Sequence, residues 1–326
     1  MEKRDQIVKL LKVTRMHIVL GGILAFILGA LLGITAGGIF NPFTIVLCYF
    51  VVFFGDLSTH YSNDYFDANQ DRLVVRRQLF SGRKILVENP NLRPLARWIS
   101  LGYLIISISL AAVAVVFRVA PVELLIITVG ANFLGWFYSA PPLRLVSRGL
   151  GELAIFLIWG PILVAGVYTV LAKGWMDHTW LVALAGVPFG LSVVSINIGK
   201  HIDKMEDDKK KGVGTWPVRI GEKAARYVTI ASLVLIYLVI VYLIFVPHYF
   251  TPVMLIVLLA GKRLLLAVGV LTKPRPQQAP EGYPSWPTWF SAFCFYHNRM
   301  FGGLFILGLI VDTLLRIFVS GFWPLI

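Results

Sequence analysis

Carboxylates and an amide recur at helical spacing in the segment His60–Asp71, which reads His-Tyr-Ser-Asn-Asp-Tyr-Phe-Asp-Ala-Asn-Gln-Asp. On a helix, Asn63, Asp67 and Asp71 lie at i, i+4 and i+8, and Asp64 precedes the two aspartates by three and seven positions, so the group shares one face. Like charges stacked in this way repel one another unless a cation lies among them. Mg²⁺ suits such oxygens, because it binds few carboxylates and leaves room for phosphate oxygens. The competing interpretation is a solvated acidic helix end.

A second acidic cluster follows about 140 residues later, within the stretch Asn197–Gly221. Asp203 and Asp207 are four residues apart and share a helix face, whereas Asp208 is turned about 140° away from Asp203 on an ideal helix. Taken alone, the alternating charges of this stretch are typical of a cytoplasmic loop.

Basic side chains surround both clusters. They are Arg72, Arg76, Arg77, Arg83, Lys84, Lys200, Lys204 and Lys209 to Lys211. Carboxylates alone would bind a cation and basic groups alone an anion, but a complex of Mg²⁺ with a polyphosphate requires both. Apolar segments precede each cluster and would accept a lipid tail. Together these features predict a site for a lipid diphosphate at a membrane surface.

The composition identifies a polytopic membrane protein. Of 326 residues, 57% are hydrophobic and only 14% are charged, against about 25% charged in soluble domains. The net charge is +13, but the apolar content argues against a nucleic-acid partner, and the basic residues have the simpler role of orienting the chain in the bilayer. Cys48 and Cys294 lie in apolar surroundings and indicate neither a disulfide framework nor a metal site.

Apolar runs of about 20 residues predict an all-α integral membrane protein with nine transmembrane helices, arranged as two four-helix halves and one C-terminal helix. The expected spans are 17–37, 42–62, 97–117, 121–138, 151–171, 178–199, 226–246, 251–271 and 299–319. We expect residues 1–326 to form a single transmembrane domain. Its segments 63–96 and 200–225 are predicted to be cytoplasmic active-site loops.

The loop charges predict the orientation of the chain. Lys and Arg concentrate at the N-terminus and in the loops 63–96, 139–150, 200–225 and 272–298, while the opposite loops carry little beyond Arg118 and Lys173. The positive-inside rule therefore places the N-terminus in the cytoplasm and the C-terminus on the opposite side of the cell membrane. Prolines exclude one continuous helix over 272–298, whose aromatic residues are typical of an interfacial anchor, with a lid over the site as the alternative.

The first acidic cluster resembles a motif of the UbiA-type superfamily of intramembrane prenyltransferases, NDxxDxxxD, at every position from Asn63 to Asp71. Tyr138-Ser-Ala-Pro-Pro-Leu-Arg144 is similar to that family's segment between the fourth and fifth helices. Arg148-Gly-Leu-Gly-Glu152-Leu, followed by Phe156-Leu-Ile-Trp-Gly-Pro, looks like the branch that makes menaquinone-type lipids from dihydroxynaphthoate. The resemblance covers nearly the whole chain.

The second motif departs from the family, whose two aspartates are usually four residues apart. Counting back from Gly212, the expected positions are Asp208 and Lys204. We take Asp203 as one ligand and leave its partner open between Asp207 and Asp208.

The resemblance implies a Mg²⁺-dependent prenyltransferase with two metal ions, a polyprenyl diphosphate donor and an aromatic acceptor. The implied catalytic residues are Asp67, Asp71, Asp203 and Tyr138, and the implied metal ligands are Asn63, Asp67, Asp71, Asp203, Asp207 and Asp208. The implied substrate-binding residues are Asn63, Asp64, Arg72, Arg83, Lys84, Arg144, Lys200, Lys204 and Asn132.

Two of these residues also have plain structural interpretations. Tyr138 faces the allylic cation or is an ordinary core tyrosine, and Asn132 lines the cavity or hydrogen-bonds a neighbouring helix. For the whole chain, the alternatives are prenyl transfer to haem, chlorophyllide, a glycerol phosphate lipid or a phosphosugar. An ion-coupled transporter or a lipid-binding scaffold is also considered, but acidic clusters at helix ends beside basic loops favour the enzyme.

Overall fold

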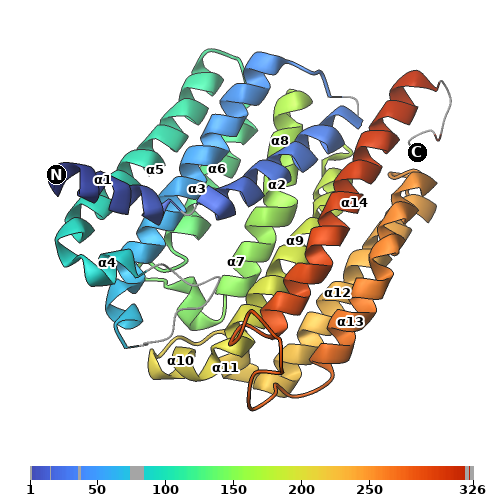
Figure 1. Cartoon of the computed structure of the whole chain (residues 1–326). Helices are drawn as coiled ribbons and strands as arrows, with labels where there is room; N and C mark the ends of the chain where they lie inside the picture. The colour runs from blue at the N-terminus through green and yellow to red at the C-terminus, as the bar shows by residue number, and fades with distance from the viewer. Residues whose placement is uncertain (1, 15, 36–37, 74–83, 320–322, 324–326) are drawn as a thin grey trace.

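The computed structural model describes residues 2–14, 16–35, 38–73, 84–319 and 323, and within these ranges it contains helices and no strand (Figure 1). The long helices are α1 (Glu2–Val13), α2 (Met16–Thr35), α3 (Pro42–Asp71), α5 (Arg93–Val116), α6 (Val122–Trp136), α9 (Thr179–Asp203), α12 (Glu222–Phe245), α13 (Gly261–Leu271) and α14 (Phe290–Phe318). A broken helix consists of α7 (Gly151–Leu157), a π-helical turn (Ile158–Ile162) and α8 (Leu163–Leu171). The short helices are α4 (Ile85–Glu88), α10 (Met205–Lys210) and α11 (Trp216–Ile220), and 3₁₀ segments cover Pro90–Leu92, Leu145–Arg148 and Pro252–Ala260.

Seven helical segments of the described chain are long and apolar enough to cross a membrane. They are Pro42–Asp71, Pro90–Val116, Gly151–Leu171, Thr179–Asp203, Glu222–Phe245, Pro252–Leu271 and Phe290–Phe318. The two other expected spans coincide with α2, for which the apolar stretch Ala25–Ile34 is described, and with α6, which has 15 residues. The all-helical prediction is confirmed, and seven candidate spans are found in the described chain, whereas the count of nine stays a prediction.

The buried core lies around α9, which packs against α7, α8, α12 and α14. Small residues permit this close packing. A Cβ on Gly160, in the π-helical turn, would lie 3.0 Å from the carbonyl oxygen of Gly186, and one on Gly190 would lie 2.7 Å from that of Phe156. Because backbone atoms cannot yield as side chains do, α9 can approach the broken helix only where side chains are absent.

Helix α14 begins at Phe290, nine residues before the expected span at 299. The predicted start of this helix was wrong, because the last proline of the segment 272–298 is Pro287 and a helix can begin soon after it. The segment before α14 is fixed by aromatic and cationic contacts: Arg275 stacks over Trp286, and Tyr283 packs against Trp289 and Phe293.

The end of α3, the short helices α10 and α11 and the segment between α13 and α14 lie at one end of the bundle, the lower end in Figure 1. The chain thus brings its two acidic clusters, 140 residues apart, to the same end of an apolar bundle.

Candidate active site

A polar pocket lies between the C-terminal end of α3 and the junction of α9 and α10. It is lined by Asn63, Asp64, Asp67, Gln70, Asp71, Tyr138, Val146, Lys200, His201, Lys204, Asp208, Lys211 and Val213. One wall, from α3, carries carboxylates and amides. The opposite wall, called the α9–α10 wall, carries three lysines: Lys200 in α9, Lys204 between the two helices and Lys211 directly after α10. The spacing predicted for the first cluster is confirmed: α3 presents Asn63, Asp64, Asp67 and Asp71 to one pocket.

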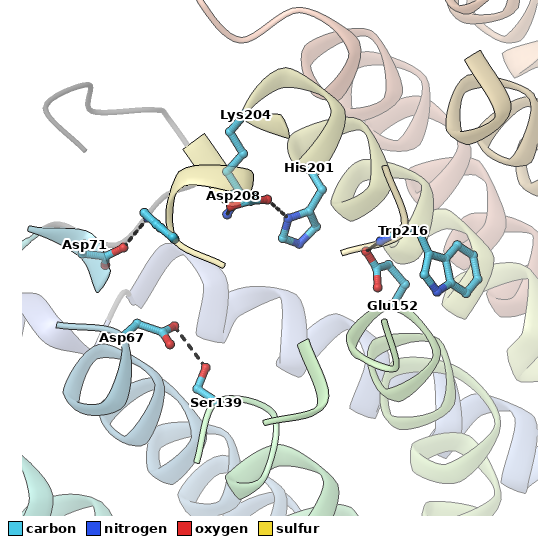
Figure 2. Close-up of polar contacts among 9 residues, drawn as sticks. Asp67, Asp71, Ser139, Glu152, His201, Lys204, Asp208 and Trp216 are labelled. Atoms are coloured by element: carbon cyan, nitrogen blue, oxygen red, sulfur yellow. Dashed lines mark hydrogen bonds and ion pairs between the residues drawn. The ribbon is translucent and has the colours of Figure 1, made fainter. Parts of the chain in front are cut away.

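The α3 wall has the ligands that a hard cation needs. The Oδ1 atom of Asn63 is buried beside the pocket and has no hydrogen-bond donor within the described part of the chain. Oδ2 of Asp67 accepts a hydrogen bond from the Ser139 hydroxyl at 3.0 Å, and Oδ1 of Asp71 lies 2.6 Å from Nζ of Lys211 (Figure 2). An orphaned amide oxygen beside two aspartates fits Mg²⁺.

No group of three His, Cys, Asp or Glu side chains in the described residues forms a closed metal cage. Mg²⁺ is usually held by one or two carboxylates together with phosphate oxygens of a substrate. The oxygen ligands of the α3 wall, Asn63, Asp67 and Asp71, are of the type that this ion prefers.

The opposite wall is organised by Asp208, whose side chain is 1% exposed. Its Oδ2 lies 2.8 Å from Nδ1 of His201 and its Oδ1 lies 2.9 Å from Nζ of Lys204 (Figure 2). Burial alone would raise the pKa of Asp208, but the Lys204 ammonium and the His201 hydrogen bond outweigh it and hold that pKa below its usual value. Asp208 is therefore an anion that anchors a histidine and a lysine.

Asp203 is separated from this pocket and caps α14. Its carboxylate accepts hydrogen bonds from the backbone N–H groups of Trp289, Phe290 and Ser291 and from the Ser291 hydroxyl, at 2.6 to 3.1 Å. The first N–H groups of a helix have no partner within the helix, so a carboxylate there is strongly favoured. We therefore revise the predicted role of Asp203 from metal ligand and catalytic residue to helix cap.

Replacing Asp203 by alanine is expected to destabilise the protein while leaving its metal site intact. Loss of the cap leaves buried N–H groups unpaired and should lower the free energy of unfolding by about 2 kcal/mol. Thermal unfolding in detergent measures this loss, and Mn²⁺ titration measures the metal site. Asp177→Ala, at an exposed position, is the control. Weakened Mn²⁺ binding with unchanged thermal stability would restore Asp203 as a ligand.

Tyr138 lies in the pocket with its hydroxyl against the Asn197 side chain. Its electron-rich ring, beside the carboxylates of the α3 wall, is suited to facing a cation.

The remaining predicted residues lie elsewhere. Asp207 is half-buried outside the lining, so of the two alternatives it is Asp208 that reaches the pocket. Arg72, Lys84 and Arg144 are not in the lining either, and Arg83 lies outside the described residues. Asn132 donates hydrogen bonds to the Ser107 hydroxyl and to the Thr128 carbonyl, which matches its helix-packing interpretation.

Sequence reasoning missed two positioning residues. Ser139 binds Asp67, and Glu152, fully buried, accepts a hydrogen bond from the Trp216 backbone N–H at 3.0 Å (Figure 2). Trp216 also donates from Nε1 to the Gly149 carbonyl, so Glu152 helps to fix the segment after α10. Ser139 could have been predicted from its position next to Tyr138. The contact between Glu152 and Trp216 could not, because the two residues are 64 positions apart in the sequence.

Comparisons with known proteins identify the family of this chain. The model of the UbiA prenyltransferase family matches residues 23–293. The chain is 34% identical over 108 residues to the 2-carboxy-1,4-naphthoquinone phytyltransferase of Synechocystis, covering 33% of this chain and 34% of that protein. It is 25% identical over 150 residues to the 1,4-dihydroxy-2-naphthoate octaprenyltransferase of Bacillus subtilis, covering 46% and 43%. The matches thus span about a third of the first relative and less than half of the second.

A solved structure shares the fold. The UbiA homolog from Archaeoglobus fulgidus bound to GPP and Mg²⁺ superposes with a TM-score of 0.62 at 17% identity, covering 94% of this chain and 99% of that one. The family model covers most of the chain and includes both walls of the pocket, and on this basis the chain belongs to the UbiA prenyltransferase family.

Proposed function

We propose that this protein is a Mg²⁺-dependent membrane prenyltransferase that transfers a polyprenyl group from an allylic diphosphate to an aromatic acceptor. The observation that carries the proposal is the two-sided pocket, with a carboxylate and amide wall from α3 facing a lysine wall from α9 and α10. Such a pocket matches a metal-bound diphosphate, which presents both signs of charge. The A. fulgidus homolog, whose structure was solved with GPP and Mg²⁺, supports the assignment of the ligand.

Each wall has its own role in the reaction. Asn63, Asp67 and Asp71 would hold the cation, which would supply positive charge to the diphosphate when bound. Lys200, Lys204 and Lys211 stabilise the negative charge that grows on the diphosphate as the allylic C–O bond breaks and both bonding electrons leave with it. Tyr138 then faces the allylic cation, and the apolar bundle excludes water until the acceptor ring attacks C1. The attacked ring carbon then loses the proton it carries, or its carboxyl group as CO₂, and the ring becomes aromatic again.

The acceptor is proposed to be a dihydroxynaphthoate-type ring in lipid-quinone synthesis. The names of the Synechocystis and B. subtilis relatives support this choice, as do the residues from Arg148 to Pro161. The sequence predicts nine spans in one domain, 1–326, with the N-terminus and the active-site segments 63–96 and 200–225 in the cytoplasm. We retain that arrangement in the proposal, because the described helices match the spans and the polar pocket lies at one end of them.

The reaction can be tested with purified protein in lipid nanodiscs, geranylgeranyl diphosphate, Mg²⁺ and 1,4-dihydroxy-2-naphthoate. We expect a prenylated dihydroxynaphthalene-type product by mass spectrometry, with release of diphosphate and of the proton, or of the carboxyl group as CO₂, from the attacked ring carbon. A panel containing haem, chlorophyllide and a glycerol phosphate lipid tests the other acceptors. If product formed with only one of those compounds, the acceptor would be that compound and not the naphthoate. If no acceptor led to release of diphosphate, the proposed reaction would be wrong.

Removal of the metal is expected to stop the reaction completely. Chelation with EDTA should reduce product formation to background, because the donor diphosphate and the α3 carboxylates would repel each other without a cation between them. Addition of excess Mg²⁺ or Mn²⁺ should restore it. Turnover that persists in EDTA would show that the lysine wall is sufficient on its own.

A further inference from the structure

The α9–α10 wall offers a single carboxylate to the pocket: its Oδ2 is hydrogen-bonded to His201, and its Oδ1, which has no hydrogen bond among the described residues, is ion-paired with the Lys204 ammonium at 2.9 Å. Asp208 holds His201 through one oxygen and Lys204 through the other. Asp207 lies outside the lining, and Asp203 is committed to the start of α14. A second magnesium ion at this wall would have to displace the Lys204 ammonium from a carboxylate that is almost fully buried.

The remaining groups of this wall do not favour a metal. Lys200 and Lys211 line the pocket beside Lys204, so this wall contributes three cationic side chains and one carboxylate, with Lys211 also paired to Asp71 across the pocket. His201 offers a ring nitrogen, and Mg²⁺ prefers oxygen ligands. The α9–α10 wall therefore favours an anionic ligand over a metal cation.

The α3 wall differs in this respect. Asp71 is paired with Lys211, but Asn63, Asp64 and Asp67 also line the pocket on the same helix face. A cation there does not depend on Asp71 alone, and the buried Oδ1 of Asn63 has no donor among the residues that the structure describes.

We propose that this chain binds its diphosphate donor with one divalent cation, on the α3 wall, and that the Lys204 ammonium supplies the positive charge at the place of a second cation. This inference rests on the proposed function, and it replaces the two ions expected from the sequence. Lys204 lies one helical turn before Asp208, so an aspartate at position 204 could share a cation with Asp208.

Position 204 permits a direct test, because it is the N-cap of α10, where aspartate is a favoured residue. The protein in detergent is titrated with Mn²⁺ in the presence of geranylgeranyl thiolodiphosphate, an unreactive donor analogue, and bound Mn²⁺ is counted by electron paramagnetic resonance. We expect one Mn²⁺ per chain with an uncoupled spectrum. Lys204→Asp is expected to bind two Mn²⁺ and to show the spin coupling of a nearby pair.

Lys210→Asp is the matched control, because Lys210 is exposed and lies outside the pocket lining, and it should retain one Mn²⁺. Lys204→Met should also retain one Mn²⁺ while weakening the binding of the analogue by about tenfold or more. Two coupled Mn²⁺ ions in the unmodified protein would overturn the inference and leave the proposed function standing. Absence of analogue-dependent Mn²⁺ binding in the unmodified protein would overturn both.

Discussion

Replacing Asp67 by asparagine is expected to lower kcat by about 10³-fold or more, equivalent to about 4 kcal/mol of transition-state stabilisation. Asp67 lies at the centre of the α3 wall, between Asn63 and Asp71. Asparagine retains an oxygen that accepts the Ser139 hydroxyl, so the local fold persists while the negative charge that attracts the cation is lost. Single-turnover product formation at saturating donor measures the effect.

Two measurements separate loss of metal from loss of fold. Thermal unfolding of Asp67→Asn should match that of the unmodified protein, while the Mn²⁺ dissociation constant should rise by about tenfold or more. Asp177→Asn, an exposed position outside the pocket lining, should change neither quantity. If Asp67→Asn reacted at the normal rate, the α3 wall would not be the metal site.

Replacing Asp208 by alanine is expected to have the largest effect on stability. The substitution leaves the Lys204 ammonium and the His201 imidazole without their shared anion in a site where Asp208 is almost fully buried. Removal of one partner from a buried ion pair costs about 3–5 kcal/mol in the free energy of unfolding. Unfolding in detergent followed by tryptophan fluorescence measures the change, and turnover should fall with it because Lys204 loses its anchor.

Asp207→Ala is the matched control, because Asp207 is half-buried next in sequence and does not line the pocket. Its effect on stability should stay within about 0.5 kcal/mol. Since the pKa of Asp208 is held below its usual value, its stabilising contribution is present above the unfolded-state pKa of about 4 and is lost only as the pH falls through the lower folded-state pKa. The difference between the unmodified protein and Asp208→Ala should therefore be constant between about pH 6 and pH 8. Equal losses for the two alanine variants would contradict the assigned role of Asp208.

The helical fold could be predicted because it depends on local properties. Apolar runs of membrane length and the spacing of Asn63, Asp67 and Asp71 are properties of one segment at a time. The approximate positions of most apolar helices and the face that α3 presents to the pocket therefore followed from the sequence, whereas α1 and the early start of α14 did not.

The second wall could not be predicted in the same way, because it depends on contacts between distant segments. The acidic residues near Asp203 in the sequence suggest a metal ligand, yet its carboxylate accepts hydrogen bonds from residues 86 to 88 positions away. Close approach of α14 to Gly199, where a Cβ would lie 2.8 Å from the Ser291 nitrogen, brings the helix start to the carboxylate. The spacing of Asp203 and Asp207 on an ideal helix was misleading for a physical reason, since α9 ends at Asp203 and α10 starts anew at Met205.

The cap on α14 also has a consequence for biosynthesis. The donors that satisfy Asp203 belong to residues 289–291, which the ribosome adds long after α9. Until then the carboxylate at the end of α9 lacks these donors, and hydration of that helix end is favoured instead. A chain arrested before residues 289–291 would therefore hold both acidic clusters without the capped helix end next to Lys204.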